Sequence, residues 1–430
     1  MVASANSQNL TGSLEVPFTI NKVDISLGKL YEHGAVLPGV SDKDWSGKPC
    51  VLADGWEISA GGRRWLASDV ALSYGNNVNA AGKGSSAAPT VTVSAVNQNL
   101  TGSFSVKYTI KRVSHWERIW GATAFETMES ISRKSYPSGS NSVVVATFDG
   151  YWDALTASSL ASFEEAPILL TKGTGLSDQA RRETQRLKAT RAIVVGGPAA
   201  VSNEVISQIE NMGLSVSRQS GKTATETAVQ VYKAKIGQWS KTAIVATADG
   251  HWDALSIAPF SYLKKSPVFL AEVDSHALSD DTLAAIAAGD FENAIIVGGP
   301  AAVSTDVDRQ LGSFGLEVKR LSGPTAASTS LAIAKYAISQ GMTAKNAGVA
   351  TIDGYWDALT GAALCGKYNS VLMLASEGDT SCMEGMISLS RNGAYLTSRK
   401  ANLQHGFVFG GQAAVPNALI ENFEMMYVGP

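Results

Sequence analysis

Two kinds of hydrophobic pattern divide the chain. Near the N-terminus, apolar and polar residues alternate, as in residues 99–110 and in a matching stretch at 9–20. This period of two predicts half-buried β-strands. Further along, apolar runs without alternation recur at 143–147, 243–247 and 347–351. Such runs predict strands of a parallel sheet that helices cover on both faces.

The alternating part of the chain predicts a small β-domain. The stretches at 9–20 and 99–110 both begin Asn-Leu-Thr-Gly-Ser and lie 90 residues apart. A strand at 89–96 is expected to pair with the second stretch across a short turn. We therefore predict an all-β, Ig-like sandwich at 23–112, and interpret residues 1–22 as the last strand of a truncated preceding β module.

The rest of the chain is one unit written three times. The heptapeptide Asp-Gly-x-Trp-Asp-Ala-Leu recurs with spacings of 100 and 104 residues, at 149–155, 249–255 and 353–359. A second motif follows each copy, as Gly-Gly-Pro-Ala-Ala-Val-Ser at 196–202 and 298–304 and as Gly-Gly-Gln-Ala-Ala-Val-Pro at 410–416. Repetition at this length indicates three tandem modules, which we place at 116–217, 218–319 and 320–430.

Each module repeats the same order of elements. An Arg-x-x-Gly segment leads into a helix, and the buried strand, the Asp-Gly-x-Trp-Asp turn and a second helix follow. Further strands are expected at 167–170, 267–270 and 371–374, at 192–195, 294–297 and 407–409, and at 215–217 and 317–318. This alternation predicts an α/β fold of three tandem Rossmann-like parallel sheets with right-handed crossovers.

Composition narrows the class of protein. The 430 residues are 45% hydrophobic and only 17% charged, with a net charge of −3. Large cores are therefore expected, and nonspecific nucleic-acid binding is not. The sequence contains no run of about 20 apolar residues, so no membrane span is predicted. The N-terminus lacks the pattern of a signal peptide, so the protein is either cytosolic or a fragment or mature form of an exported chain. The truncated β module at 1–22 favours the second interpretation.

No pattern of residues indicates catalysis, a metal or a cofactor. The histidines do not recur at equivalent positions, and no cysteine has metal-ligand spacing. Neither a Gly-x-Gly-x-x-Gly fingerprint nor a P-loop is present, so nucleotide binding is not expected. Cys365 and Cys382, 17 residues apart, could form a disulfide or remain buried thiols.

Two repeated pairs of side chains are candidates for ligand binding. Each Asp follows a buried strand, where open α/β sheets bind ligands, but it could equally serve as an N-cap or first-turn carboxylate. Each neighbouring Trp could stack on a sugar or pack between modules. These residues are Trp152 and Asp153, Trp252 and Asp253, and Trp356 and Asp357.

Glycines and arginines recur as well. The Gly-Gly pair ends a strand, where backbone amides could hold a phosphate or glycine could simply permit a tight turn. The arginine could bind phosphate or carboxylate with its bidentate fork, or form ion pairs between modules. The candidates are Gly197, Gly299 and Gly411, and Arg118, Arg218 and Arg320.

The ordered series of motifs resembles the cell wall binding repeat 2 family, which occurs as three tandem copies in Gram-positive surface proteins. The resemblance covers residues 116–430 and implies three Rossmann-like modules around a pseudo-threefold axis. It also implies noncovalent anchoring to an anionic cell-wall polymer, a polysaccharide or teichoic-acid-like chain. The third copy departs from the family where Ser328-Thr329 replaces the Glu-Thr of 126–127 and 226–227. The N-terminal part resembles tandem β-sandwich modules of such proteins.

Two functions are compatible with these features. The first is anchoring of a surface protein to the Gram-positive cell wall, outside the cell, by a monomer whose three modules give avidity. The second is a structural or adhesive platform that presents the β module or the longer segment at 375–406 to a partner. An enzyme is not expected, because no catalytic constellation is found.

Overall fold

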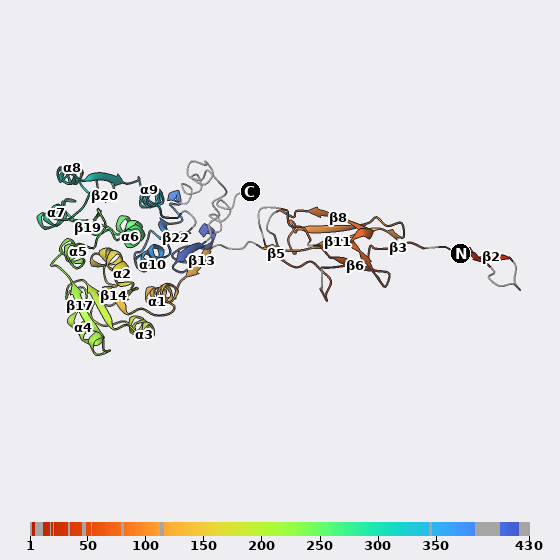
Figure 1. The fold of residues 1–430 in the computed structure, drawn as a ribbon, viewed down its shortest axis with the longest axis horizontal. Helices are drawn as coiled ribbons and strands as arrows, with labels where there is room; N and C mark the ends of the chain where they lie inside the picture. Colours follow the sequence, from red (N-terminus) through yellow and green to blue (C-terminus); the bar gives the residue numbers. More distant parts are fainter. Residues whose placement is uncertain are drawn as a thin grey trace. The chain divides into compact units, whose positions relative to one another are not determined.

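The computed structural model describes residues 2–4, 12–17, 19, 21–32, 35–44, 49–52, 54–78, 81–111, 116–343, 346–382 and 405–420. The chain forms two compact units, Met1–Ser114 and His115–Gly429 (Figure 1).

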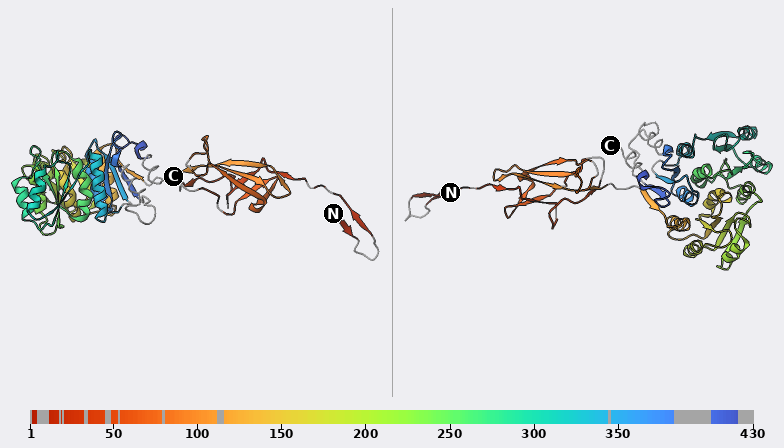
Figure 2. Two further views of the ribbon diagram at one scale, coloured as in Figure 1. Left: turned by 90° about the horizontal axis from the view of Figure 1, so that it is seen from above. Right: turned by 180° about the vertical axis from the view of Figure 1, so that it is seen from behind.

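Short strands make up the N-terminal unit (Figure 2). Two three-stranded antiparallel sheets have the orders β4-β6-β7 and β11-β9-β8, and β3 with β10 and β5 with β12 form parallel pairs. A separate hairpin joins β1 (Val2–Ser4) to β2 (Ser13–Glu15). The other elements are β3 (Val23–Asp24), β4 (Lys29–Tyr31), β5 (Lys43–Asp44), β6 (Glu57–Ala60), β7 (Arg63–Leu66), η1 (Ala67–Asp69), β8 (Val70–Gly75), β9 (Thr90–Ala95), β10 (Leu100–Thr101), β11 (Ser103–Lys107) and β12 (Ile110–Lys111).

The predicted pairing within this all-β module is confirmed. Strand β11 pairs antiparallel with β9, with Ser103 opposite Ser94. Alternate residues of β9, Val91 and Val93, are fully buried and belong to the same core as Ile58. The period-two pattern therefore marks the inward-facing positions correctly.

Parallel sheets of four strands form the first two modules of the second unit. The order is β15-β14-β16-β17 in one and β19-β18-β20-β21 in the other, and every neighbouring pair is parallel. The strands are β14 (Ser142–Thr147), β15 (Ile168–Thr171), β16 (Arg191–Val195), β17 (Ser215–Gln219), β18 (Thr242–Thr247), β19 (Val268–Ala271), β20 (Asn293–Val297) and β21 (Glu317–Leu321). These positions confirm the predicted α/β fold and its strands.

The third sheet closes the repeats into a ring. Its order is β13-β24-β22-β23, and β13 (Trp116–Ile119) comes from the beginning of the unit. The other strands are β22 (Asn346–Thr351), β23 (Val371–Ala375) and β24 (His405–Phe409). Strand β13 thus takes the edge position that β17 and β21 hold in the other two sheets. Residues 383–404, within the longer segment of the third module, lie outside the described residues.

Threonine starts the first helix of each module. The side chains of Thr123, Thr223 and Thr325 each accept a hydrogen bond from the backbone N–H three residues on, as N-caps do. The helices are α1 (Ala124–Ser135), η2 (Asp153–Thr156), α2 (Ala157–Glu164), α3 (Asp178–Leu187), α4 (Asn203–Glu210), α5 (Ala224–Lys233), α6 (Trp252–Lys264), α7 (Asp280–Ala287), α8 (Thr305–Ser313), α9 (Ala326–Ser339) and α10 (Trp356–Lys367).

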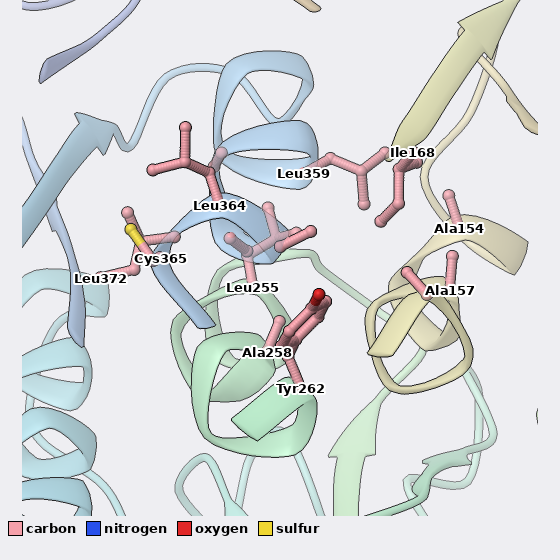
Figure 3. Close-up of a cluster of buried hydrophobic side chains, with 14 of the residues drawn as sticks. Ala154, Ala157, Ile168, Leu255, Ala258, Tyr262, Leu359, Leu364, Cys365 and Leu372 are labelled. Atoms are coloured by element: carbon pink, nitrogen blue, oxygen red, sulfur yellow. The ribbon is translucent and has the colours of Figure 1, made fainter. Parts of the chain in front are cut away.

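One inner helix from each module forms the centre of the ring. Helices α2, α6 and α10 pack against one another (Figure 3). Their contact contains Ala157, Leu255 and Leu359, which are at most 1% exposed. A helix that is apolar on all sides is expected only in the interior, so these helices fix the pseudo-threefold arrangement. Cys365 and Cys382 are both fully buried and are not joined in a disulfide.

Among the described residues, no helix is both long and apolar enough to cross a bilayer.

Candidate functional site

The three arginines hold the Gly-Gly turns. A guanidinium N–H of Arg118 donates to the carbonyl oxygen of Gly410 at 2.8 Å. Arg218 donates in the same way to Gly196 at 2.6 Å, and Arg320 to Gly298 at 2.9 Å. Each arginine therefore clamps the carbonyl where a central strand ends.

The other terminal nitrogen of each guanidinium group, Nη2, contacts the helix that follows the turn. The partner is the side-chain oxygen of Asn417 for Arg118, Asn203 for Arg218 and Asp308 for Arg320. Arg320 and Asp308 belong to the same four-stranded sheet unit. Because Arg320 begins the third copy and Asp308 belongs to the second, the ion pair described for these arginines crosses the boundary between two copies within one sheet unit.

The first glycine of each pair lies against the repeated Asp. Gly196, Gly298 and Gly410 have φ of 119°, 108° and 102°, a region that L side chains rarely adopt. A Cβ on Gly298 would lie 2.6 Å from Oδ2 of Asp253. Glycine is therefore needed both for the turn and for the close approach of the carboxyl group.

Each Asp is a first-turn residue of a helix, and Asp153 and Asp357 reach a threonine of another module. Asp153 hydrogen-bonds to the hydroxyl of Thr227, and Asp357 to that of Thr127. The same hydroxyls accept hydrogen bonds from the backbone N–H groups of Gly221, at 3.0 Å, and Gly121, at 3.1 Å. The Asp and the Thr of Glu-Thr thus form a joint between modules, which the sequence did not reveal.

Burial dominates the electrostatics of these carboxyl groups. It raises the pKa of Asp253 and of Asp357 to about 6, and it also raises the pKa of Asp153. The hydrogen bonds to threonine oppose this shift in Asp153 and Asp357. Oδ1 of Asp357 is buried and has no hydrogen-bond partner among the described residues, so it retains an unused acceptor.

The repeated tryptophans differ in their environments. The indole N–H of Trp252 donates to the carbonyl oxygen of Ile352 at 2.9 Å, and that of Trp356 to Phe148 at 3.0 Å. Both bonds cross from one module to the next. Trp152 is 47% exposed, and its indole N–H has no hydrogen-bond partner in the described part of the chain. Packing between modules is therefore established for two of the three.

The variable position of the Asp-Gly-x-Trp-Asp motif lies at the pseudo-threefold axis. The ring centroid of Tyr151 is 5.2 Å from that of His251 and 5.4 Å from that of Tyr355, and the last two are 5.6 Å apart. Burial lowers the pKa of His251. No sequence pattern indicates a role for His251, because Tyr stands at its two equivalent positions.

A cleft of about 660 Å³ lies where the third module meets the first. It contains three of the predicted residues, Trp356, Asp357 and Gly411. Trp120, which precedes Gly121 at the end of β13, also borders it. The remaining lining residues are Gly121, Ala122, Thr123, Ala124, Thr127, Phe148, Thr351, Asp353, Gly354, Gln412, Ala413 and Ala414.

The second glycines of the Gly-Gly pairs lie in open surroundings. A Cβ on Gly299 would meet nothing within 4 Å, and one on Gly411 would meet only the ring of Trp120, at 3.5 Å. One on Gly197 would lie 3.6 Å from the carbonyl oxygen of Gly221. These positions leave room beside the turn, whereas the first glycines do not.

Comparison with known protein families identifies the repeated unit. The sequence profile of Cell wall binding domain 2 (CWB2) matches residues 118–206, 218–308 and 320–420. The chain belongs to the CWB2 family. The family places it among proteins that associate with the cell wall.

Curated relatives share the CWB2 region. N-acetylmuramoyl-L-alanine amidase LytC of Bacillus subtilis (strain 168) is 25% identical over 317 residues, which are 73% of this chain and 59% of the amidase. The Amidase enhancer of the same organism is 27% identical over 331 residues, 76% of this chain and 42% of the enhancer. The chain thus spans about half the length of these relatives.

Solved structures show the same fold as the CWB2 ring. Cwp6 from Clostridium difficile superposes with a TM-score of 0.65 at 18% identity, covering 86% of this chain and 59% of Cwp6. Cwp8 from Clostridium difficile gives a TM-score of 0.64 at 22% identity, covering 83% and 63%. Both support the α/β repeat architecture.

Within the part of this CWB2 protein that the structure describes, no group of three or more His, Cys, Asp or Glu side chains could hold a metal ion. The candidate site consists instead of aromatic, small and acidic residues beside a glycine turn. Such a set of groups can stack on a ring and accept hydrogen bonds.

Proposed function

We propose that the CWB2 ring anchors a surface protein noncovalently to the Gram-positive cell wall by binding an anionic secondary wall polymer. The observation that carries the proposal is the threefold CWB2 match together with the cleft at the junction of the third and first copies. Repeated contacts along a polymer would add up to firm attachment although each is weak. The ring acts outside the cell as a monomer and without catalysis in this proposal.

The candidate ligand positions take two roles in this proposal. Trp356, Asp357 and Gly411 border the cleft and contact the polymer directly. Arg118 holds the turn that carries Gly411, because its guanidinium is bonded to the carbonyl oxygen of Gly410. By analogy Arg218 and Arg320 support the turns at the other two junctions.

The experiment is a sedimentation assay of the full chain with purified Gram-positive walls. Walls are compared before and after mild acid extraction of the secondary polymer. Binding that is lost with the polymer supports the proposal. Binding that survives extraction would contradict it and favour a platform that meets another wall component or partner. If the chain does not sediment with washed walls at any concentration, wall anchoring is refuted altogether.

A further inference from the structure

The three junctions of the ring differ in their aromatic residues. Trp120 precedes the Gly of Arg-x-x-Gly at the junction of the third and first modules, whereas serine stands at the equivalent positions 220 and 322. Phe148 follows the Ala-Thr strand end in the first module, where the others have Ala248 and Ile352. Only this junction therefore combines an exposed indole with a phenyl ring beside the cleft.

The aromatic rings of the cleft lie against neighbouring groups of the two modules. Trp120 is 54% exposed, and its ring lies over Gly411, where an added Cβ would come within 3.5 Å of Cε3. The Trp120 carbonyl accepts a hydrogen bond from the hydroxyl of Ser130 on α1 at 3.1 Å. Phe148 stacks on Trp356, with a centroid distance of 5.1 Å. The cleft thus presents the ring of Trp120 beside the stacked pair of Phe148 and Trp356.

The polar groups of the cleft disfavour an anion. Asp353 and Asp357 are among its lining residues, and the described lining contains no Lys or Arg. A second cavity of about 430 Å³ shares Asp353 and Gln412 with it and adds Glu377, again without a described cation. A phosphate placed here would meet carboxylates at short range without a compensating charge, which is unfavourable.

Hydroxyl groups are the complementary ligand. The exposed carboxylate of Asp353 can accept a hydrogen bond, and the Gln412 amide can both donate and accept. A volume of about 660 Å³ is within the range of pockets that hold small organic ligands. An uncharged ring with hydroxyls at its edge and an apolar face would satisfy both the aromatic and the polar groups.

We propose that the junction of the third and first modules is a subsite for an uncharged sugar ring, stacked on Trp120 and hydrogen-bonded to Asp353 and Gln412. This inference rests on the proposed wall anchoring and assigns to this junction the neutral sugar units of the polymer. The anionic groups of the polymer remain outside the cleft. The junctions that carry serine in place of Trp120 lack this subsite.

The test uses the full chain and three variants. Trp120→Ser introduces the residue of the other two junctions, Ser220→Trp places an indole at a second junction, and Phe314→Ser removes an exposed aromatic ring outside the candidate site as a control. Ligand-observed saturation-transfer NMR is recorded with a panel of neutral hexoses and N-acetylhexosamines and with glycerol phosphate as the anionic probe. Thermal unfolding of each variant checks that the ring is intact.

We expect at least one neutral sugar to bind, with affinity lowered about fivefold or more in Trp120→Ser and unchanged in Phe314→Ser. Ser220→Trp is expected to retain or increase the signal, and glycerol phosphate to show no dependence on Trp120. No binding of any neutral sugar, equal binding by Trp120→Ser, or Trp120-dependent binding of glycerol phosphate would overturn the inference.

Wall sedimentation separates this inference from the proposed function. A wild-type chain that does not sediment with walls defeats the anchoring proposal, whatever the sugar titration shows. A wild-type chain that sediments, with Trp120→Ser sedimenting equally well, leaves anchoring in place and removes the cleft from it. Weaker sedimentation of folded Trp120→Ser supports both.

Discussion

Replacing Asp253 by asparagine removes a buried negative charge while nearly preserving the shape of the side chain. Burial raises the pKa of Asp253 from 3.8 to about 6. The folded state therefore binds a proton more tightly than the unfolded state. This residue favours folding fully below pH 3.8, and that contribution is lost as the pH rises toward about 6. A shift of about two pKa units corresponds to about 3 kcal/mol.

The assay measures the free energy of unfolding in urea between pH 4 and pH 8 for wild type, Asp253→Asn and Asp249→Asn. Asp249 is an exposed carboxylate in the same motif and serves as the matched control. We expect Asp253→Asn to be more stable relative to wild type at pH 7.5 than at pH 4, by about 2.5 kcal/mol, because part of the contribution is already lost at pH 4. Asp249→Asn measures the effect of the same substitution at an exposed position. If the two variants show the same pH dependence, burial of Asp253 does not penalise its charge and the reasoning is refuted.

Further variants test the joints of the ring by thermal unfolding. Gly298→Ala should lose about 2 kcal/mol or more, because alanine is strained at this φ and its Cβ would collide with Asp253; an unchanged Tm would contradict this role. Trp252→Phe should lose about 1 kcal/mol through its missing bond between modules, and more than Trp152→Phe, which has no such bond to lose. Arg218→Ala should lose about 1–3 kcal/mol, since it leaves a turn carbonyl without its charged donor; a neutral effect would show that the clamp is dispensable.

The strands were predictable because their pattern is local. Residues of β14 are all buried, as the lack of alternation in 143–147 indicated, because both faces of this strand are covered. The repeated motifs then fixed the order of elements three times over. The strands of the N-terminal module were predictable from a different local pattern, because Val91 and Val93 alternate with polar neighbours.

The joints of the ring were not predictable in the same way. The Arg-x-x-Gly segment of the first module reads as the start of that module, yet β13 pairs with β24 at the opposite end of the unit. Thr127 reads as an ordinary helix residue, although its hydroxyl bonds to Asp357 of the third module. In the sequence, Trp120 differs from its equivalents only in being tryptophan where positions 220 and 322 carry serine. Such contacts depend on which surfaces meet after folding, which one sequence does not encode as a local pattern.

The pairing of β13 with β24 also affects when the ring can form. Arg118 and Gly410, which are hydrogen-bonded in the finished structure, are 292 residues apart. The third sheet therefore has to wait for nearly the whole unit to be synthesised, and it then closes over a very long loop. In an open solenoid each repeat meets only its neighbours and repeats can be gained or lost one at a time. In this ring, deletion of a repeat would leave two sheet edges without partners, so the number of copies is fixed by closure.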